Sequence, residues 1–216
     1  MILDGQLPAS IAAAAQALQR GELLGLPTET VYGLAADAGN DQAVAKIFEA
    51  KGRPANHPLI VHVASAQGVQ RFASHVPDFA QKLIDAFWPG PLTLILPRRP
   101  EVAAVAAGGQ NSVGLRCPSH PVAHVVLQSA EALGVFGVAA PSANLFGRVS
   151  PTTAVHVAGE FGDSLLIIDG GACDVGIEST IVDCTRAAPV LLRPGVLTPQ
   201  QLSEACGETV ITPTAP

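Results

Sequence analysis

The sequence predicts an α/β domain in which a mixed sheet is flanked by helices. Helical and strand-like patterns alternate along the whole chain, as is typical of this class. The chain has 216 residues, of which 48% are hydrophobic, so it can bury a sizeable core. Its 21 Gly and 18 Pro residues follow no repeat, and they make several loops too irregular for two-residue hairpins. We therefore expect a mixed sheet.

Capping residues and apolar stripes place three helices in the first half of the chain. Ser10 is a candidate N-cap for a helix that continues to Arg20. Asp41 is a candidate N-cap for a second helix, and Pro77 opens a third that has one apolar stripe. A short apolar run follows each of these helices. The strands expected from them are residues 22–26, 59–63 and 92–96.

The second half of the chain continues the alternation. A helix expected at residues 121–133 ends at Gly134, and a shorter helix is expected at residues 152–161. We find no domain boundary before about Thr198. The strands expected here are residues 112–116, 135–139, 165–168, 180–183 and 190–192.

Composition and charge weigh against several classes of function. The net charge of -6 argues against a large basic surface for nucleic acids. The four cysteines lack C-x-x-C spacing, so we expect reduced thiols and no structural zinc. No apolar stretch reaches the roughly 20 residues that span a bilayer, and residues 1–7 lack the basic start of a secretory signal. We therefore expect a cytoplasmic protein without a membrane helix. The signature motifs of P-loop NTPases, Rossmann dehydrogenases, serine hydrolases and zincins are absent.

The placement of the cations indicates an anionic ligand. Five of the twelve Lys and Arg residues lie in or beside Gly/Pro-containing segments at the predicted ends of strands or helices, where α/β sheets bind ligands. The alternative is that cations in turns are merely solvated. The pair Lys51 and Arg53, fixed by Pro54, favours a site. The five are Lys51, Arg53, Arg116, Arg148 and Arg193.

Polar loop residues give a second, weaker signal. One Gly/Pro-bounded segment carries Ser142, Asn144 and Ser150, whose hydroxyl, amide and backbone groups can cradle anions, although ordinary turn chemistry also explains them. His57 and His62 bracket the strand that follows the Lys51 loop. The carboxylates are scattered and form no metal cage, so we expect any Mg²⁺ to arrive on substrate phosphates.

Eight short strings occur in an order that resembles the YrdC-like threonylcarbamoyl-AMP synthases. The resemblance runs from about Leu23 to Gly195, and several strings in order are far more specific than any one of them. The strings are Pro27-Thr28-Glu29-Thr30-Val31-Tyr32-Gly33-Leu34, Lys51-Gly52-Arg53-Pro54, Pro58-Leu59, Trp88-Pro89-Gly90-Pro91-Leu92-Thr93, Leu115-Arg116, Pro141-Ser142-Ala143-Asn144, Ser150-Pro151-Thr152 and Ser179-Thr180.

The resemblance implies a twisted α/β fold with a deep, positively lined cavity. In that cavity ATP, L-threonine and bicarbonate become threonylcarbamoyl-AMP and pyrophosphate. We expect Mg²⁺ to arrive with the ATP and the product to pass to a tRNA threonylcarbamoyl transferase complex, and the net charge of -6 predicts weak or no direct binding of tRNA. The catalytic domain covers residues 1–198, and a short helix and flexible tail cover residues 199–216.

Carried over by position, the resemblance assigns thirteen residues to substrates, and Lys51 and Arg53 to catalysis. His57 stands where family members more often have Asn or another polar residue. The residues assigned to ATP are Lys51, Arg53, His57, Ser112, Ser142, Asn144, Ser150 and Arg193. The residues assigned to threonine are Thr30, His62, Arg116, Ala140 and Ser179.

Two other functions stay open at this point. The first is an RNA-binding module, although one Trp and one Tyr offer few stacking platforms. The second is a carbamoyl-transfer enzyme in which a YrdC-like domain adenylates carbamate. Longer family members continue into a linker and a second domain. The strings at residues 177–180 and 192–195 look closer to that longer type, so the chain is either a natural short form or a truncated one.

Overall fold

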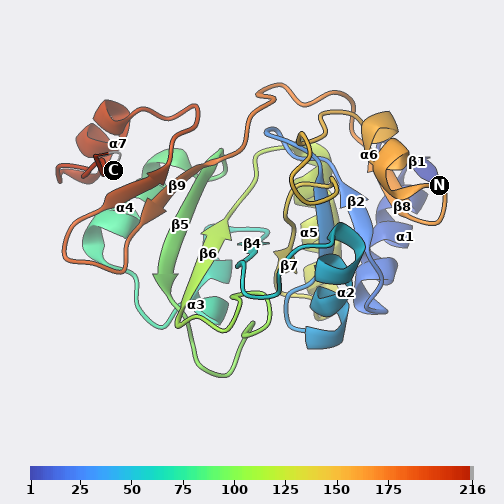
Figure 1. Ribbon diagram of the computed structural model, residues 1–216, viewed down its shortest axis with the longest axis horizontal. Coiled ribbons are helices and arrows are strands. Elements are labelled where there is room, and N and C mark those ends of the chain that lie inside the picture. Colours follow the sequence, from blue (N-terminus) through green and yellow to red (C-terminus); the bar gives the residue numbers. More distant parts are fainter. Residues whose placement is uncertain (215–216) are drawn as a thin grey trace.

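Ten strands form one mixed sheet in the computed structural model, which describes residues 1–214 (Figure 1). The strands lie side by side in the order β1-β8-β2-β3-β7-β4-β6-β5-β9-β10. In chain order they are β1 (Ile2–Asp4), β2 (Leu24–Leu26), β3 (Gly33–Asp37), β4 (Ile60–His62), β5 (Leu92–Pro97), β6 (Ser112–Arg116), β7 (Val138–Ala139), β8 (Leu166–Asp169), β9 (Thr180–Asp183) and β10 (Val190–Arg193).

Helices flank the sheet, with α4 and α7 at one end and α1, α2, α5 and α6 toward the other (Figure 1). A 3-10 turn, η1 (Ala66–Gly68), leads into the shortest helix. The helices are α1 (Pro8–Gln19), α2 (Asp41–Lys51), α3 (Val69–Phe72), α4 (Asp78–Phe87), α5 (Pro121–Ala132), α6 (Ala154–Phe161) and α7 (Pro199–Cys206). Over residues 1–214, no helix combines the length and apolar character that a bilayer span requires.

Strand pairing confirms the predicted mixed sheet. Four neighbouring pairs are parallel: β1 with β8, β2 with β8, β4 with β6, and β5 with β9. The other five pairs are antiparallel, including β4 with β7 and β5 with β6. Parallel neighbours require long crossover connections, and the helices supply several of these.

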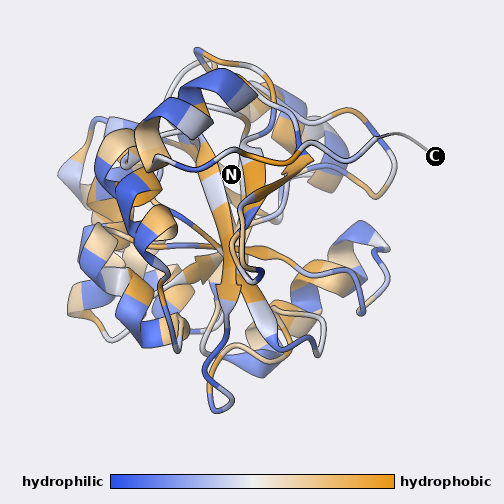
Figure 2. Ribbon diagram, turned by 90° about the vertical axis from the view of Figure 1, so that its left-hand side faces the viewer, coloured by the Kyte–Doolittle hydropathy of each residue, from blue (hydrophilic) through white to orange (hydrophobic). Residues whose placement is uncertain are grey.

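The core lies where the helices pack against the strands. Most residues of β2, β3 and β5 are buried, with Leu26, Leu34 and Leu94 fully so. Figure 2 shows hydrophobic colouring along the central strands and hydrophilic colouring mainly on the outer helices and loops. Burying apolar surface contributes about 25 cal/mol per Å², so this core supplies most of the driving force for folding.

Two predicted caps are wrong. The helix α1 begins at Pro8, and Ser10 is buried inside its first turns. The cap of α2 is Asn40, whose side chain accepts hydrogen bonds from Gln42 and Ala43. The N–H group of the first helical residue has no partner within the helix, so proline, which lacks this group, is well suited to that position and starts α1 at Pro8.

Two strands, β1 and β3, were not predicted, because each is too short or too rich in Ala and Gly to give a period-two pattern.

The helix predicted after Thr198 is present as α7, which Thr198 caps. Beyond it the chain runs beside β10, where Ile211 donates its N–H to Pro189 O at 2.9 Å and accepts from Leu191 at 2.8 Å. The division into residues 1–198 and 199–216 stays a prediction. Residues 215–216 of the predicted tail lie outside the described residues.

The connection from β8 to β9 bridges the two ends of the sheet. It runs along the top of Figure 1 in orange, from the part that carries β2 and β8 to the part that carries β5 and β9. Cys173 donates to Thr152 O at 2.9 Å on the way, and Val175 and Gly176 donate to the carbonyls of Glu29 and Thr30 at 2.9 and 3.0 Å. These bonds fix the loop at residues 27–32 beneath the connection.

Candidate functional site

A cavity of about 210 Å³ collects most of the predicted site residues. Eight of the thirteen line it. A larger groove of about 670 Å³ between α1 and α5 has no charged side chain on its lining, so it lacks the cations expected at a site for an anionic ligand. The eight are Thr30, Arg53, His62, Arg116, Ala140, Ser142, Ser179 and Arg193, and the lining also includes Glu178.

Alternation along the strands directs side chains into the cavity. Successive residues of a strand point to opposite faces, so Gly114 and Arg116 of β6 lie on one face, together with Ser112 at the start of the strand. Gly114 and Arg116 line the cavity, whereas Ser112 lies farther along, outside the lining. A Cβ atom at Gly114 would lie 3.2 Å from Ile95 Cδ1, so glycine keeps this part of the floor open.

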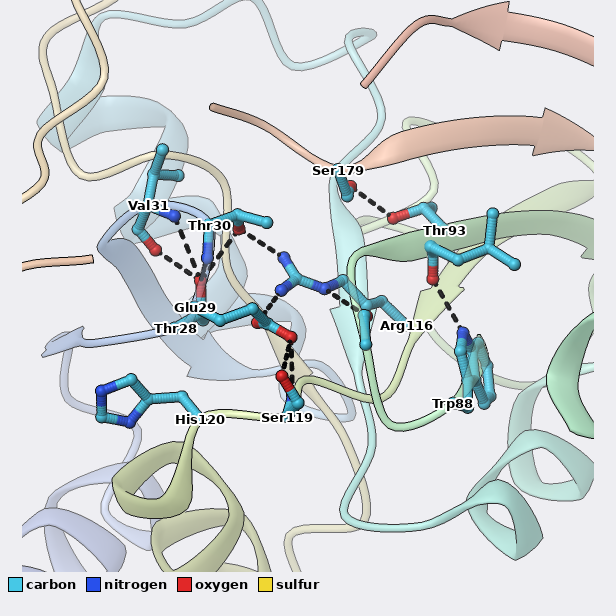
Figure 3. A network of polar contacts seen from close by, with 12 residues as sticks. Thr28, Glu29, Thr30, Val31, Trp88, Thr93, Arg116, Ser119, His120 and Ser179 are labelled. Carbon is cyan, nitrogen blue, oxygen red and sulfur yellow. Dashed lines mark hydrogen bonds and ion pairs between the residues drawn. The ribbon is translucent and has the colours of Figure 1, made fainter. Parts of the chain in front are cut away.

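Arg116 is a deeply buried cation of the site, with 3% of its surface exposed. Its Nη2 donates to Glu29 Oε1, its Nη1 donates to Thr30 Oγ1 at 2.7 Å, and its Nε donates to Gly90 O at 3.2 Å (Figure 3). Burial lowers the pKa of Arg116, and the negative charge of Glu29 opposes this shift. Arg116 therefore stays a fixed, charged donor beside the cavity.

The loop before β3 holds the hydroxyl that meets Arg116. Thr28 Oγ1 accepts from the N–H groups of Thr30 and Val31 at 3.3 Å and donates to Val31 O at 2.6 Å, a turn typical of threonine. The two threonine hydroxyls lie 3.0 Å apart. The side chain of Thr30 is therefore held in place before any ligand binds.

Lys51 lies behind the cavity wall. It is the last residue of α2, only 3% exposed, and its Nζ donates to Ser142 O and Asn144 O at 2.5 Å each. Burial, with a smaller contribution from the positive charge of Arg53, lowers the pKa of Lys51 to about 8. Lys51 therefore braces the loop at residues 142–144 and brings a titratable charge to it.

Arg53 reaches the cavity from the loop after α2. Its Nη2 donates to Pro58 O at 2.9 Å and its Nε donates to His57 O at 3.4 Å. His57 itself lies outside the lining and is exposed, with its ring centroid 5.6 Å from that of Phe146. The structure therefore brings Arg53 to the other predicted residues, but leaves His57 at the surface nearby.

Asn144 carries a buried polar atom without a partner. Its Nδ2 donates to Leu145 O at 2.8 Å and Arg148 O at 3.0 Å. Its Oδ1 has no hydrogen-bond partner, and no other buried side-chain N or O atom in the described part of the chain shares that condition. An unpaired buried acceptor is unfavourable, which is typical of a position that a ligand or water completes.

Arg193 joins the end of β10 to the start of β9. Its Nη1 donates to Glu178 Oε2 at 2.8 Å and its Nε donates to Ser179 O at 2.9 Å. Glu178 also accepts from Ser150 Oγ at 3.2 Å, and Ser179 Oγ lies 2.7 Å from Thr93 Oγ1. Ser150 is thereby linked to the cavity lining through Glu178.

His62 faces the cavity from the end of β4 as a neutral ring. Burial, aided by the positive charge of Arg116, lowers the pKa of His62 to about 3. Its Nδ1 lies 3.2 Å from Ile60 O, and because a carbonyl only accepts, this nitrogen is the donor. His62 therefore contributes polarity without adding charge.

Two carboxylates complete the site, and sequence reasoning assigned neither of them to it. Glu29 lies inside the first of the eight strings, residues 27–34, and Glu178 directly precedes Ser179. The signal that could have found them is the nearness of each to predicted site residues, because buried cations need counter-charges. Among residues 1–214, no group of three or more His, Cys, Asp or Glu side chains could hold a metal ion.

Comparison with known proteins gives a family and named relatives. The Sua5/YciO/YrdC family model, described as "Telomere recombination", matches residues 16–195. The chain is 47% identical over 201 residues to the threonylcarbamoyl-AMP synthase of Pyrococcus abyssi, covering 93% of this chain and 58% of that protein. It is 44% identical over 199 residues to the threonylcarbamoyl-AMP synthase of Bacillus subtilis, covering 91% and 56%. The chain thus spans somewhat more than half the length of these two relatives.

A shorter relative is matched nearly end to end. The chain is 37% identical over 198 residues to the putative threonylcarbamoyl-AMP synthase of Mycobacterium tuberculosis H37Rv, covering 91% of this chain and 89% of that protein. Among solved structures, P. abyssi Sua5 complexed with L-threonine has a TM-score of 0.90 at 43% identity, covering 98% of this chain and 62% of that one. Escherichia coli YciO, at 20% identity and a TM-score of 0.80, shares the fold.

Proposed function

Because the chain belongs to the Sua5/YciO/YrdC family, we propose that it is an L-threonylcarbamoyladenylate synthase, a nucleotidyltransferase that uses ATP, L-threonine and bicarbonate. The observation that carries this proposal is the gathering of eight predicted site residues around one cavity. The relatives named threonylcarbamoyl-AMP synthase and the L-threonine complex of P. abyssi Sua5 support it.

The cavity divides into two halves under this proposal. The amino-acid half is built from Thr30, His62, Arg116, Ala140 and Ser179, and the nucleotide half from Arg53, Ser142 and Arg193 with their supports Lys51, Asn144 and Ser150. His57 and Ser112, which lie outside the lining, are proposed as outer ATP contacts.

The chemistry needs positioned charge more than a protein nucleophile. The threonine amine combines with bicarbonate to form a carbamate, releasing water. A carbamate oxygen then bonds to the α-phosphorus of ATP, while the bond from that phosphorus to the oxygen bridging to the β-phosphate breaks and pyrophosphate leaves. Negative charge develops on the phosphate oxygens, and cations such as Lys51 and Arg53 stabilise it. Arg116 binds the threonine carboxylate and so fixes the amine in reach.

The donor set fits a Mg²⁺ ion that arrives on the ATP phosphates. Glu178, the single carboxylate that the described residues place on the cavity lining, is paired with Arg193, so the phosphates and water would hold the ion. Mg²⁺ commonly keeps several waters and binds through substrate phosphates with one or two carboxylates. The ion supplies charge neutralisation at the phosphates, whereas this chain binds and orients the substrates.

We further propose that the product passes to a tRNA threonylcarbamoyl transferase complex in the cytoplasm. Threonylcarbamoyl-AMP is an activated acyl donor, so an acyl-transfer reaction must consume it. A net charge of -6 supports weak or no direct binding of tRNA by this chain.

Adenylate formation tests the function. The protein is incubated with ATP, bicarbonate and L-threonine, L-serine or L-valine, and pyrophosphate and the adenylate are measured, the latter by mass spectrometry. We expect rapid reaction with threonine, slow reaction with serine and almost none with valine. Serine lacks only the methyl group of threonine, which costs little binding energy. Valine lacks the hydroxyl, and a site that hydrogen-bonds this hydroxyl rejects valine far more strongly. Valine adenylated as fast as threonine would contradict the substrate.

Two further arms separate the alternatives. Turnover with carbamoyl phosphate in place of threonine and bicarbonate would favour the carbamoyl-transfer enzyme. Salt-dependent RNA binding without ATP turnover would favour the RNA-binding module.

A further inference from the structure

Glu29 is a carboxylate buried behind Arg116, outside the cavity lining. Only 9% of its side chain is exposed. Both of its oxygens are used by the protein itself: Oε1 accepts from Arg116, and Oε2 accepts from the N–H of Ser119 at 2.7 Å and from its Oγ at 2.5 Å. Figure 3 shows the Glu29 side chain lying between Arg116 and Ser119. Glu29 is thus placed to act on Arg116 and not on a substrate.

The contacts of Arg116 leave a defined part of its guanidinium for a ligand. A guanidinium has five N–H groups. Glu29, Thr30 and Gly90 accept one each, from three different nitrogens. The two remaining N–H groups, one on each terminal nitrogen, donate to no acceptor within residues 1–214. Two donors on the two terminal nitrogens of a guanidinium suit the two oxygens of a carboxylate.

Glu29 also keeps the guanidinium charged and in place when no ligand is bound. An unpaired buried charge is strongly unfavourable, so without Glu29 the side chain of Arg116 would turn toward water or toward another anion. Of the other nearby carboxylates, Glu178 already pairs with Arg193 at 2.8 Å. The backbone carbonyl of Glu29 accepts from Val175, which ties this pair to the connection between β8 and β9.

We propose that Glu29 is a positioning residue for the amino-acid substrate: it fixes the plane of Arg116 so that the two unused N–H groups face the cavity and receive the carboxylate. This inference rests on the proposed function, because it takes the ligand of Arg116 to be an amino acid. Glu29 touches neither reactant, and its effect on binding is exerted through Arg116 and Ser119.

The test is separate calorimetric titration of L-threonine and of ATP into the intact chain and its variants. Glu29→Gln keeps the shape of the side chain but removes its charge. We expect this change to weaken threonine binding by at least about tenfold while ATP binding stays within about twofold. Ser119→Ala keeps both charges and removes one hydrogen bond, so threonine binding weakens by about threefold. Glu22→Gln, in the exposed pair with Arg20, is the matched control and changes neither affinity.

The outcomes of these titrations decide whether Glu29 positions Arg116 for threonine. Unchanged threonine affinity in folded Glu29→Gln, or an equal loss of threonine and ATP affinity, would overturn the positioning role. If Glu29→Gln does not fold, Ser119→Ala decides, and unchanged threonine affinity in that variant overturns the proposal. If the unaltered protein does not bind threonine, both the proposed function and this inference are wrong. If the unaltered protein binds threonine and the variants bind it equally well, only this inference is wrong.

Discussion

Two glutamate–arginine pairs flank the cavity, and they differ in burial. The side chains of Glu29 and Arg116 are 9% and 4% exposed, whereas those of Glu178 and Arg193 are 37% and 33% exposed. Breaking a buried pair leaves an uncompensated charge, but a half-exposed pair exchanges partners at little cost. Under the proposed function, this comparison implies that the amino-acid half is preformed, while the nucleotide half can replace a protein contact by a phosphate.

Removing the carboxylate from each pair gives the largest expected difference. We expect Glu29→Ala to lower the free energy of unfolding by about 3 to 5 kcal/mol, because Arg116 loses its buried partner. Glu178→Ala should lower it by about 1 kcal/mol or less. Urea unfolding followed by the fluorescence of Trp88, the single tryptophan, measures both. Equal losses would contradict the contrast between the pairs.

The cations of the nucleotide half are expected to dominate turnover. Lys51→Ala and Arg53→Ala should each lower the rate of pyrophosphate release by at least about tenfold, which corresponds to about 1.4 kcal/mol of transition-state stabilisation. Lys51→Ala should have the larger effect, because its Nζ also holds Ser142 and Asn144. Lys46→Ala, which removes an exposed lysine on the same helix, is the control. Near-normal rates in both folded variants would refute the assignment.

Exchanging arginine for lysine should separate the two halves. Lysine keeps the charge but loses the planar fork. We expect Arg116→Lys to raise the apparent Michaelis constant for threonine by about tenfold with little change for ATP, and Arg193→Lys to do the reverse. Steady-state kinetics with each substrate varied in turn provides the measurement. A parallel rise in both constants for Arg116→Lys would place that residue at the nucleotide.

The pH dependence of ATP binding should report Lys51. Its pKa is lowered to about 8 by burial, so the ammonium form is lost as the pH rises through this value. Because phosphate favours the charged form, ATP affinity should fall above about pH 8. Lys51→Arg keeps its charge over this range and should flatten the profile. An affinity that does not change across pH 8 in the unaltered protein would argue against a role for the Lys51 charge.

The smallest expected effect concerns Glu178. In the free protein it occupies Arg193 and Ser150, two groups proposed to bind ATP. Glu178→Gln should therefore free both groups for the nucleotide and strengthen ATP binding. The expected gain is only about two- to fivefold, because a partly exposed ion pair contributes little binding energy and is easily displaced. Titration calorimetry with Mg·ATP checks this. A weaker affinity would mean that Glu178 assists the nucleotide and does not compete with it.

Much of the fold could be predicted from the sequence because its signals are local. The strands at residues 112–116 and 180–183 were predicted with the bounds that they have in β6 and β9. The cap of α2 was misplaced by one residue because Asn40 and Asp41 are both good capping residues. The strand β3 was missed because its Gly-Leu-Ala-Ala-Asp sequence has weak strand propensity and depends on pairing with β2 and β7.

The sequence could predict which residues belong to the candidate site, but not the contacts between them. The order of motifs indicated which cations belong together, and Arg53, Arg116 and Arg193 do line one cavity. Sequence could not indicate that Lys51 would point at backbone carbonyls, or that Glu29 would lie behind Arg116. These contacts join residues 87 to 93 positions apart, and only tertiary packing brings them together.

The most direct test of the contrast between the halves is a crystal structure of the protein with L-threonine and a non-hydrolysable ATP analogue. We predict that Glu29 still pairs with Arg116, which also holds the threonine carboxylate, and that Arg193 has left Glu178 for a phosphate oxygen. If the Glu29–Arg116 pair is open in the complex, or if Glu178 and Arg193 remain paired beside the bound nucleotide, the distinction between a preformed and an exchangeable half is wrong.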